Sequence, residues 1–375
     1  KVSQMERNSL SCNIILRDTI ERVYPDLMKN LELIGDSKSY QRVVLSGHTA
    51  CVTSVCFNPY DNGQTLATGS ADKTIRIWNT FAATSESAFT CISILDGHTH
   101  SISSLTYIEK KVDNGNKIVI LASSSLDKTI RLWNIDTKTC ISILNEHSNW
   151  IQTLAYSSNG ILASGSHDTT IRIWNIEDNN TEFKSSAILD EHTGPIWALA
   201  WNNGSVASDK KTLASSSSDR TIKLWEQNID TDNENSTEQP QYKCVATLKH
   251  SPNRICSLSF SPNGSTLASG ALDGMIYLHD ASSKMLTGTL KGHEGRIYGL
   301  QWRSNSLSLV SGSWDKFVGV WDVSKKELYA VLGTNPNETD SGGGHSKWIM
   351  SVDCHPSGGK MIASGSDDNT VRIWH

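Results

Sequence analysis

A histidine, a serine or threonine and an aspartate recur together along this chain. In a hydrolase these side chains would act as base, nucleophile and orienting acid. The seven sets, each in that order, are His48, Thr68 and Asp72; His98, Ser123 and Asp127; His147, Ser164 and Asp168; His192, Ser215 and Asp219; His250, Ser269 and Asp273; His293, Ser311 and Asp315; and His345, Ser364 and Asp368. Seven equivalent triads in one chain are not credible as catalytic centres. We therefore interpret the sets as structural.

Other catalytic signatures are missing from the sequence. There is no GxxxxGK[ST] phosphate loop, no HExxH motif and no GxSxG elbow. The eight cysteines form no CxxC pair, so zinc-binding and thioredoxin-type redox motifs are absent as well. We expect a protein that is not an enzyme and that uses no metal ion and no cofactor.

The elements that position these residues repeat along the chain. Seven similar segments, among them "LATGSADKTIRIWN" and "LVSGSWDKFVGVWD", begin at Leu66, Leu121, Leu162, Leu213, Leu267, Leu309 and Ile362. The histidines that precede them are 43 to 58 residues apart, which brackets the period of a propeller blade.

Each repeat is expected to form four β-strands. The segment "TIRIW" alternates apolar and polar residues, as a half-buried strand does. The preceding "SGSxD" supplies small residues and an aspartate for a tight turn. Segments such as "VTSVCF" after the histidine and "CISIL" later in the repeat predict two further strands. The sequence therefore predicts an all-β fold, a single seven-bladed β-propeller of four-stranded blades.

This pattern resembles the WD-repeat family over roughly residues 41–375. In that family a His, a Ser or Thr, an Asp and a Trp form a buried hydrogen-bonded chain in each blade. Numbering the blades in chain order, the tryptophans that complete the sets above are Trp78, Trp133, Trp174, Trp225, Trp321 and Trp374. Such a chain satisfies every polar group that it buries. In blade five, His279 replaces the tryptophan, so we expect this blade to be held less firmly.

The two ends of the repeat region complement each other. His375 directly follows the third strand of blade seven, which leaves that blade one strand short. The segment "YQRVVL", Tyr40–Leu45, precedes blade one and has no blade of its own. We expect it to supply the outer strand of blade seven and close the ring, because closure removes exposed sheet edges. The predicted propeller therefore covers residues 40–375.

Residues 1–39 differ in kind from the repeats. Ile14, Ile15, Ile20, Val23 and Leu27 recur at helical spacing, which predicts a short amphipathic helix in an N-terminal extension. The segment "LSCNIILRDTIERVYP" resembles the tail of RING and U-box domains over some sixteen residues. Because the chain begins with Lys, we expect a fragment or a processed form, and the resemblance to RING and U-box domains would place a catalytic domain upstream of Lys1.

The family resemblance also implies where a partner binds. Three positions per blade line the top rim of the central channel: the third and fifth residues after the histidine and the residue before the turn aspartate. In blade five, one inserted residue shifts the first two positions by one, so that they fall on Arg254 and Cys256. In blades one and two these three positions carry only small or aliphatic residues, whereas in blades three to seven they include four Trp, one Tyr and two Arg. The candidate partner-binding residues are Trp150, Gln152, His167, Pro195, Trp197, Arg254, Leu272, Arg296, Tyr298, Trp314, Trp348, Met350 and Asp367.

One tryptophan of this set stands out. Trp314 lies seven residues before Trp321 in "SGSWDKFVGVWD", and only Trp321 matches the structural position of the blade. The other copies carry Ala, Leu, His, Ser, Leu and Asp at the position of Trp314, so the fold does not require an indole there. Trp, Tyr and Arg dominate interface hot spots. We therefore expect a lopsided aromatic and basic top face that binds a peptide or protein partner with apolar anchors and acidic character.

Charge and composition limit the partners. The net charge is −5 and the calculated isoelectric point about 6.2, which argues against nucleic acid as the main ligand. No apolar run is long enough to span a membrane, and a small-molecule substrate is not expected. Cysteines recurring within strand-like segments indicate buried, reduced thiols, which favours the cytoplasm or the nucleus.

Two functional classes fit these observations. The first is a non-catalytic protein–protein interaction scaffold within a multiprotein complex. The alternative is the substrate-recognition propeller of a RING or U-box type ubiquitin ligase. Parts of blades five to seven, "LASGALDGMIYLHD" and "GHSKWIMSV", also resemble the small scaffold propeller of the exosome-assisting Ski complex, over about a quarter of the chain. The sequence names neither the partner nor the pathway.

Overall fold

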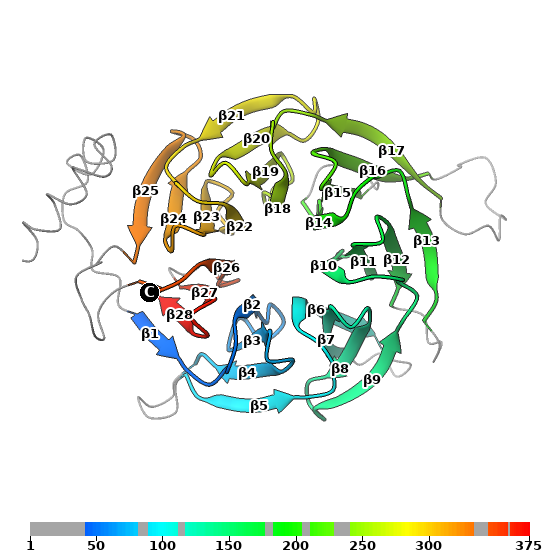
Figure 1. Ribbon diagram of the computed structural model, residues 1–375, viewed down its shortest axis with the longest axis vertical. Helices are drawn as coiled ribbons and strands as arrows, with labels where there is room; N and C mark the ends of the chain where they lie inside the picture. Colours follow the sequence, from blue (N-terminus) through cyan, green and yellow to red (C-terminus); the bar gives the residue numbers. More distant parts are fainter. Residues whose placement is uncertain are drawn as a thin grey trace, which may run out of the picture.

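The alternating pattern of each repeat becomes a four-stranded antiparallel sheet, and seven such sheets form a ring (Figure 1). This computed structural model describes residues 42–81, 89–111, 117–176, 183–204, 211–228, 241–333, 344–358 and 361–375. The described residues form 28 β-strands and no helix. The predicted all-β, seven-bladed propeller is confirmed. The expected N-terminal helical extension, residues 1–39, lies outside the described residues.

Each blade runs from an inner strand at the channel to an outer strand at the circumference. The inner strands are β2 (Val52–Phe57), β6 (Ile102–Lys111), β10 (Ile151–Tyr156), β14 (Ile196–Trp201), β18 (Ile255–Phe260), β22 (Ile297–Trp302) and β26 (Ile349–Cys354). The second strands are β3 (Thr65–Ser70), β7 (Lys117–Ser125), β11 (Ile161–Ser166), β15 (Thr212–Ser217), β19 (Thr266–Ala271), β23 (Ser308–Ser313) and β27 (Ile362–Ser366). The third strands are β4 (Ile75–Asn79), β8 (Ile130–Asn134), β12 (Ile171–Asn175), β16 (Ile222–Asn228), β20 (Ile276–Asp280), β24 (Val318–Asp322) and β28 (Val371–Trp374). The outer strands are β5 (Cys91–Leu95), β9 (Thr139–Leu144), β13 (Ser185–Leu189), β17 (Gln241–Leu248), β21 (Leu286–Leu290), β25 (Glu327–Leu332) and, for blade seven, β1 (Arg42–Leu45).

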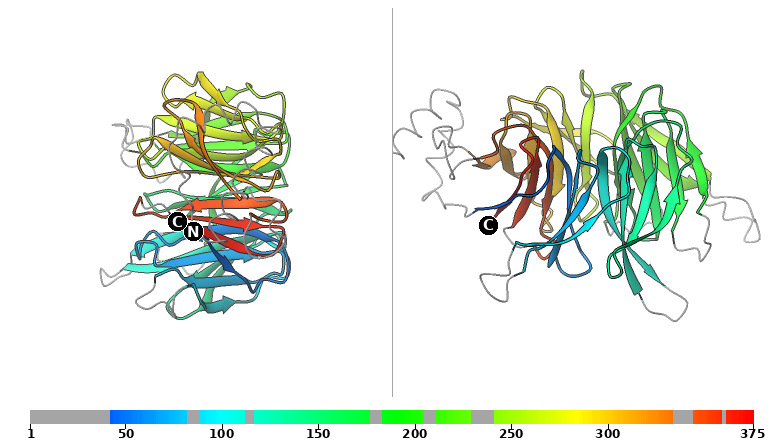
Figure 2. Two further views of the ribbon diagram at one scale, coloured as in Figure 1. Left: turned by 90° about the vertical axis from the view of Figure 1, so that its left-hand side faces the viewer. Right: turned by 60° about the horizontal axis from the view of Figure 1, so that its bottom comes forward.

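The first described strand closes the ring, as expected. β1 pairs antiparallel with β28, placing Val43 opposite Ile373 and Leu45 opposite Val371. In Figure 1 and in the side views of Figure 2, blue β1 lies beside red β28. The outer strand of blade seven therefore comes from the other end of the repeat region, which ties the two ends together.

The core lies between adjacent blades. One cluster joins Ile75 and Ile77 of blade one to Ile102 and Leu105 of blade two, and equivalent clusters follow around the ring. The small residues of the second strands permit this packing. A Cβ atom on Gly69 would lie 2.5 Å from Ile102, which explains why glycine occurs at this point of close approach.

Six blades contain the buried hydrogen-bonded chain of His, hydroxyl residue, Asp and Trp. Histidine Nδ1 lies 2.6–2.9 Å from aspartate Oδ2, and histidine Nε2 lies 2.7–2.8 Å from the hydroxyl. The same hydroxyl accepts from tryptophan Nε1 at 2.7–2.9 Å. With a neutral imidazole, Nδ1–H donates to the aspartate and the hydroxyl donates to Nε2. The hydroxyl group of each hydrogen-bonded chain is fully buried, so a substrate cannot reach it.

The aspartate of each chain also shapes the turn. Asp72 Oδ1 accepts from the backbone N–H of Thr74 at 2.9 Å, and the intervening Lys73 has a φ of 76°. Burial alone would raise the pKa of Asp72, but hydrogen bonds from Thr74, Thr49 and His48 outweigh burial and lower it to about 2. The carboxylate therefore stays ionised and holds the turn and the histidine together.

Blade five departs from this arrangement, as its sequence predicts. His250 is exposed, and its Nδ1 lies 3.2 Å from Nε2 of the buried His279. Asp273 accepts instead from Asn253 Nδ2 and from the hydroxyl of Tyr277. A cavity of about 10 Å³, the size of one water molecule, lies between these residues. The blade thus keeps its strands without the central hydrogen-bonded chain.

Blade five is expected to loosen selectively in mild acid. Burial, and then the neighbouring His250, lower the pKa of His279 to about 4. Because this value lies below that of an exposed histidine, stability is full above pH 6.5 and is lost as the pH falls toward 4. The loss at pH 5 is about 2 kcal/mol. Hydrogen exchange of β19 and β20 amides should accelerate between pH 7 and pH 5 relative to β7 and β8, after correction for intrinsic rates. His279→Gln should remove this difference; its persistence in the variant would assign it to another group.

Two polar segments of the sequence, 226–242 and 109–117, predict a loop and a turn on the bottom face, and both are shorter in the structure. Strand β16 continues to Asn228 and pairs with Gln241 of β17, and Lys111 of β6 pairs with Lys117 of β7. The strands extend because backbone pairing proceeds until the polar insertion begins. Residues 112–116, 229–240 and 334–343 lie outside the described residues.

Candidate binding face at the upper mouth of the channel

Each blade brings three side chains to the end of the channel where the inner strand begins, which we call the upper mouth. The first is the residue before the inner strand, and the second is a bulged residue within it. The third is the residue before the turn aspartate. The register of β22 against β23 shifts between Ile297 and Gly299, so Tyr298 is a bulged residue, and Trp197 occupies the same position in β14. Bulges re-aim side chains in this way near functional sites.

Backbone hydrogen bonds fix the first and third positions next to each other. The N–H of Trp314 donates to the carbonyl of Arg296 at 2.9 Å. The N–H of His167 bonds the carbonyl of Trp150 in the same way, and that of Asp367 bonds the carbonyl of Trp348. The repeat therefore places these pairs independently of their side chains, and the sequence at each pair determines the chemistry of the face.

Blades six and seven carry a stack of three rings, which we call the blade 6–7 cluster: Arg296, Tyr298, Trp314 and Trp348. The Trp314 and Trp348 rings are 4.0 Å apart and nearly parallel, at 6°. Tyr298 stacks on the Trp314 ring at 5.4 Å and 10°. The guanidinium carbon of Arg296 lies 4.2 Å from the centroid of Trp314. Trp348 is the outermost ring and is 43% exposed.

Blades three to five carry a second group, the blade 3–5 cluster: Trp150, His167, Trp197 and Arg254. The His167 ring lies 5.3 Å from Trp150 and 5.4 Å from Trp197. The guanidinium carbon of Arg254 lies 3.9 Å from the centroid of Trp197. Burial, and then the charge of Arg254, lower the pKa of His167, so its imidazole is neutral at pH 7. Trp150 is 44% exposed at the end of this cluster.

The two clusters meet at blade five and blade six. Arg254 and Tyr298 both interact with the buried thiol of Cys256, and Arg296 interacts with Tyr298. The eight residues therefore form one continuous aromatic arc from blade three to blade seven. Neither arginine forms an ion pair among the described residues. The arc thus combines exposed rings with two positive charges that carry no carboxylate partner there.

The remaining candidates lie at the same mouth without joining the ring contacts. Asp367 forms an ion pair with Lys347 at 3.5 Å, so the acidic group of blade seven is already neutralised. Gln152, Pro195, Leu272 and Met350 are half-buried and take part in none of these ring or cation–π contacts. The structure thus joins eight of the predicted partner-binding residues into one surface and leaves these five at its border.

Blades one and two use the same positions for structure. Thr53 donates from its hydroxyl to the carbonyl of Ile102 in the next blade at 2.7 Å. Ser103 donates to the carbonyl of Ile151 at 2.5 Å. These short hydroxyl side chains join neighbouring blades, which accounts for the beginning of the aromatic arc at blade three.

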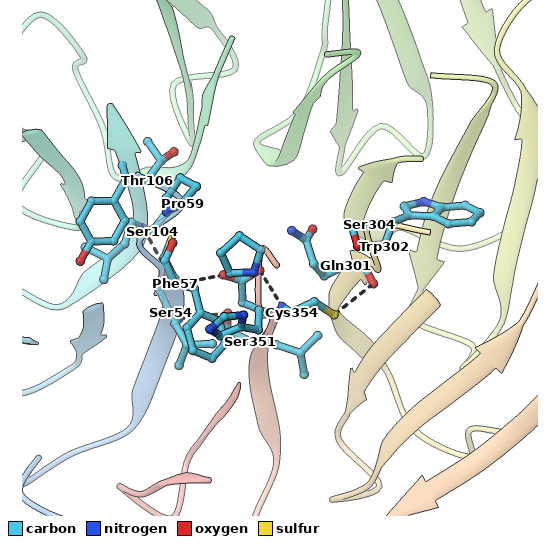
Figure 3. Close-up of a pocket in the computed structure, with 18 of the residues that line it drawn as sticks. Ser54, Phe57, Pro59, Ser104, Thr106, Gln301, Trp302, Ser304, Ser351 and Cys354 are labelled. Carbon is cyan, nitrogen blue, oxygen red and sulfur yellow. Dashed lines mark hydrogen bonds between the residues drawn. The ribbon is translucent and has the colours of Figure 1, made fainter. Parts of the chain in front are cut away.

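Sequence reasoning missed a second feature at the opposite end of the channel, the lower mouth. A cavity of about 460 Å³ opens there, lined by residues of β2, β6, β22 and β26 and by turns that follow inner strands (Figure 3). The available signal was Asp353, a carboxylate within an inner strand, where equivalent strands carry neutral residues such as Cys56, Thr106 and Gln301.

Comparison with known proteins identifies the class of protein that this fold and face define. The family model of the WD domain, G-beta repeat, matches residues 39–79, 89–134, 138–175, 183–226, 242–280, 284–322 and 338–375. The matches cover most of the chain. All but the last begin with the outer strand of one blade and continue through the first three strands of the next. The chain therefore belongs to the WD-repeat family, whose members are generally non-catalytic scaffolds.

Several curated proteins are similar to this chain. Periodic tryptophan protein 2 of Arabidopsis thaliana is 26% identical over 241 residues, which are 64% of this chain and 23% of that protein. Nuclear distribution protein nudF 1 of Talaromyces marneffei is 30% identical over 255 residues, 64% of this chain and 50% of that protein. Protein CIA1 of Arabidopsis thaliana is 32% identical over 100 residues, 26% of each chain. The chain thus spans half or less of the length of these relatives.

Two further observations bear on the setting of the protein. The described residues contain no helix that is long and apolar enough to cross a membrane. All seven cysteines in the described part of the chain are free thiols.

Proposed function

We propose that this propeller is a protein–protein interaction scaffold that binds an extended segment of a partner through the aromatic arc. The observation that carries the proposal is the pairing of each arginine with a tryptophan face, Arg254 on Trp197 and Arg296 on Trp314. Exposed Trp and Arg side chains are the residue types that dominate interface energetics. A half-exposed indole at each end of the arc provides an apolar anchor point.

The same pairing defines the charge of the partner. An aromatic cage for a methylated lysine needs ring faces that are free to receive a cation. Here two of the tryptophan faces already hold a guanidinium of the protein itself. A ligand cation would meet two like charges that have no carboxylate partner among the described residues. We therefore propose that the bound segment is acidic and contains apolar or aromatic anchors, because carboxylates pair with the free edges of the guanidiniums.

This function is non-catalytic, and free thiols suit the cytoplasm or the nucleus. The alternative role, recognition of substrates for a RING or U-box type ubiquitin ligase, would use the same face. It depends on residues 10–25, which lie outside the described residues, and no observation on the face favours it over a scaffold role.

The test is a pull-down with the triple variant Trp314→Ala, Trp348→Ala and Arg296→Ala. We expect the variant to fold like the wild type and to lose the partners that the wild type captures. A matched control, Phe81→Ala, Tyr329→Ala and Lys325→Ala, removes two exposed rings and one cation away from the upper mouth. The control should retain those partners. An unchanged set of partners on the folded triple variant would overturn the proposal.

A further inference from the structure

The cavity at the lower mouth is independent of the aromatic arc and lies at the other end of the channel. Its walls are residues from the second half of β2, β22 and β26 and from the middle of β6. The turns after the inner strands contribute Pro59, Pro262, Ser304 and Pro356. Figure 3 shows the labelled side chains Thr106, Gln301 and Cys354 around the opening, from three different blades. At about 460 Å³, the cavity is within the range of small-ligand sites in proteins.

One position of the repeat supplies the polar wall. Cys56, Thr106, Gln301 and Asp353 are equivalent residues of β2, β6, β22 and β26, and all four line the cavity. The remaining three blades carry Ala155, Ala200 and Ser259 at this position. Asp353 is therefore the one charged residue of this layer.

Asp353 is held in place by donors from two blades. Its Oδ2 accepts from the backbone N–H of Phe57 in blade one at 2.7 Å, and its Oδ1 accepts from the N–H of Cys354 at 2.8 Å. Gln301 of blade six also hydrogen bonds to this carboxyl group. These donors fix the carboxyl group at the cavity wall, but all of them are neutral.

No cation compensates this carboxylate within the described structure. None of the ion pairs among the described residues involves Asp353. Buried carboxylates are normally paired, because an isolated charge in a protein interior is costly. The neutral donors account for the position of the carboxyl group and join blade seven to blades one and six, but they leave its charge without a counter-ion. A carboxylate without a counter-ion on the wall of an open cavity points to a ligand.

The thiols, the phenol and the imidazole near Asp353 are neutral at pH 7. Burial raises the pKa of the Cys56 and Cys354 thiols and of the Tyr107 phenol, so all three are neutral at pH 7. Burial lowers the pKa of His355 in the following turn, which is therefore also neutral. Arg303, which follows β22, interacts with the Cys354 thiol.

We propose that the lower mouth binds a primary ammonium group, with Asp353 as its counter-ion and the hydroxyl and amide oxygens of Thr106 and Gln301 as further acceptors. An ammonium group has three N–H donors and matches one carboxylate with neutral acceptors around it. A metal ion fits less well, because the described residues contain no group of three or more His, Cys, Asp or Glu side chains that could hold one. The ammonium group could belong to a small alkylamine or to a lysine side chain of a peptide.

The ionisation of Asp353 gives the site a characteristic pH dependence. Burial raises the pKa of this carboxyl group to about 7, although the hydrogen bonds from Phe57, Cys354 and Gln301 act in the opposite direction. Alkylamines stay protonated throughout this range. Affinity should therefore rise about tenfold between pH 6 and pH 8, as the carboxyl group loses its proton.

The experiment is a ligand-observed NMR titration with two probes, n-butylammonium and Nα-acetyl-lysine methylamide. We expect at least one probe to bind with a dissociation constant on the order of 1 mM, because a ligand with few non-hydrogen atoms can gain only a small binding free energy. Binding of the first alone indicates a free amine as ligand, and binding of the second alone indicates a lysine of a peptide. Nε-acetylation of the lysine probe should abolish its binding. If neither probe binds the wild type at pH 8, the proposal is overturned.

A matched pair of variants tests the role of the carboxylate. Asp353→Asn keeps an oxygen acceptor for the N–H of Phe57 but places its N–H₂ group against the N–H of Cys354. Loss of this acceptor and removal of the charge should roughly offset each other, so the variant should fold at pH 8. It should bind the probes at least tenfold more weakly and without the pH dependence. Asp136→Asn makes the same charge change at an exposed turn and should bind normally. Equal binding by Asp353→Asn would overturn the proposal. If that variant does not fold, the wild-type pH series and the acetylated probe decide the question.

Discussion

Replacing Trp321 with phenylalanine is expected to lower the free energy of unfolding by about 2–4 kcal/mol, whereas the same change at Trp314 should lower it by less than about 1 kcal/mol. Trp321 is 1% exposed, and its Nε1 donates to Ser311 at 2.7 Å. Phenylalanine there leaves a cavity and removes a donor from a buried hydrogen-bonded chain. The Nε1 of Trp314 has no hydrogen-bond acceptor among the described residues, so phenylalanine loses no such bond there and keeps a ring for stacking.

The comparison is internally controlled, because both substitutions remove an indole from the same blade. Urea denaturation followed by circular dichroism gives the midpoints of both variants and of the wild type. A larger loss of stability for Trp314→Phe than for Trp321→Phe would contradict the assignment of structural and surface roles to these two residues.

The second large effect concerns charge. Replacing Arg254 and Arg296 together with glutamate should weaken the binding of acidic segments to the upper mouth at least about 100-fold, because attraction becomes repulsion at two sites of the aromatic arc. Arg254→Lys with Arg296→Lys is the matched control. It keeps both charges, removes the planar guanidiniums that stack on Trp197 and Trp314, and should weaken binding only moderately. Equal losses in the two double variants would assign binding to stacking rather than to charge.

The fold was predictable because each repeat carries a complete set of local signals. "TIRIW" has the period of a half-buried strand, and the aspartate before it marks the turn that holds the histidine. The unpaired segment before blade one and the short final blade together predicted the closure that β1 and β28 form. The weak point at blade five was visible in one residue, His279, because a repeat makes each departure from the pattern conspicuous.

The chemistry of both channel mouths was less accessible from sequence. The residue types at the upper mouth could be read position by position, but their stacking depends on β-bulges and on distances between blades. Tyr298 and Trp348, for example, both stack on Trp314, although Trp348 comes from a different blade. The cavity around Asp353 was missed because its wall combines residues from blades one, two, five, six and seven, which extend in the sequence from Ser54 to Pro356. A single aspartate in a strand does not by itself predict a cavity whose wall is built from several blades.

The central claim, that the aromatic arc binds an acidic segment with apolar anchors, is tested most directly by selecting displayed random peptides on the immobilised protein. The account predicts enriched peptides in which Asp or Glu flanks an aromatic or large aliphatic residue, and loss of this enrichment on the Arg254→Glu and Arg296→Glu double variant. Enrichment of basic peptides on the wild type, or of the same acidic peptides on the double variant, would contradict it.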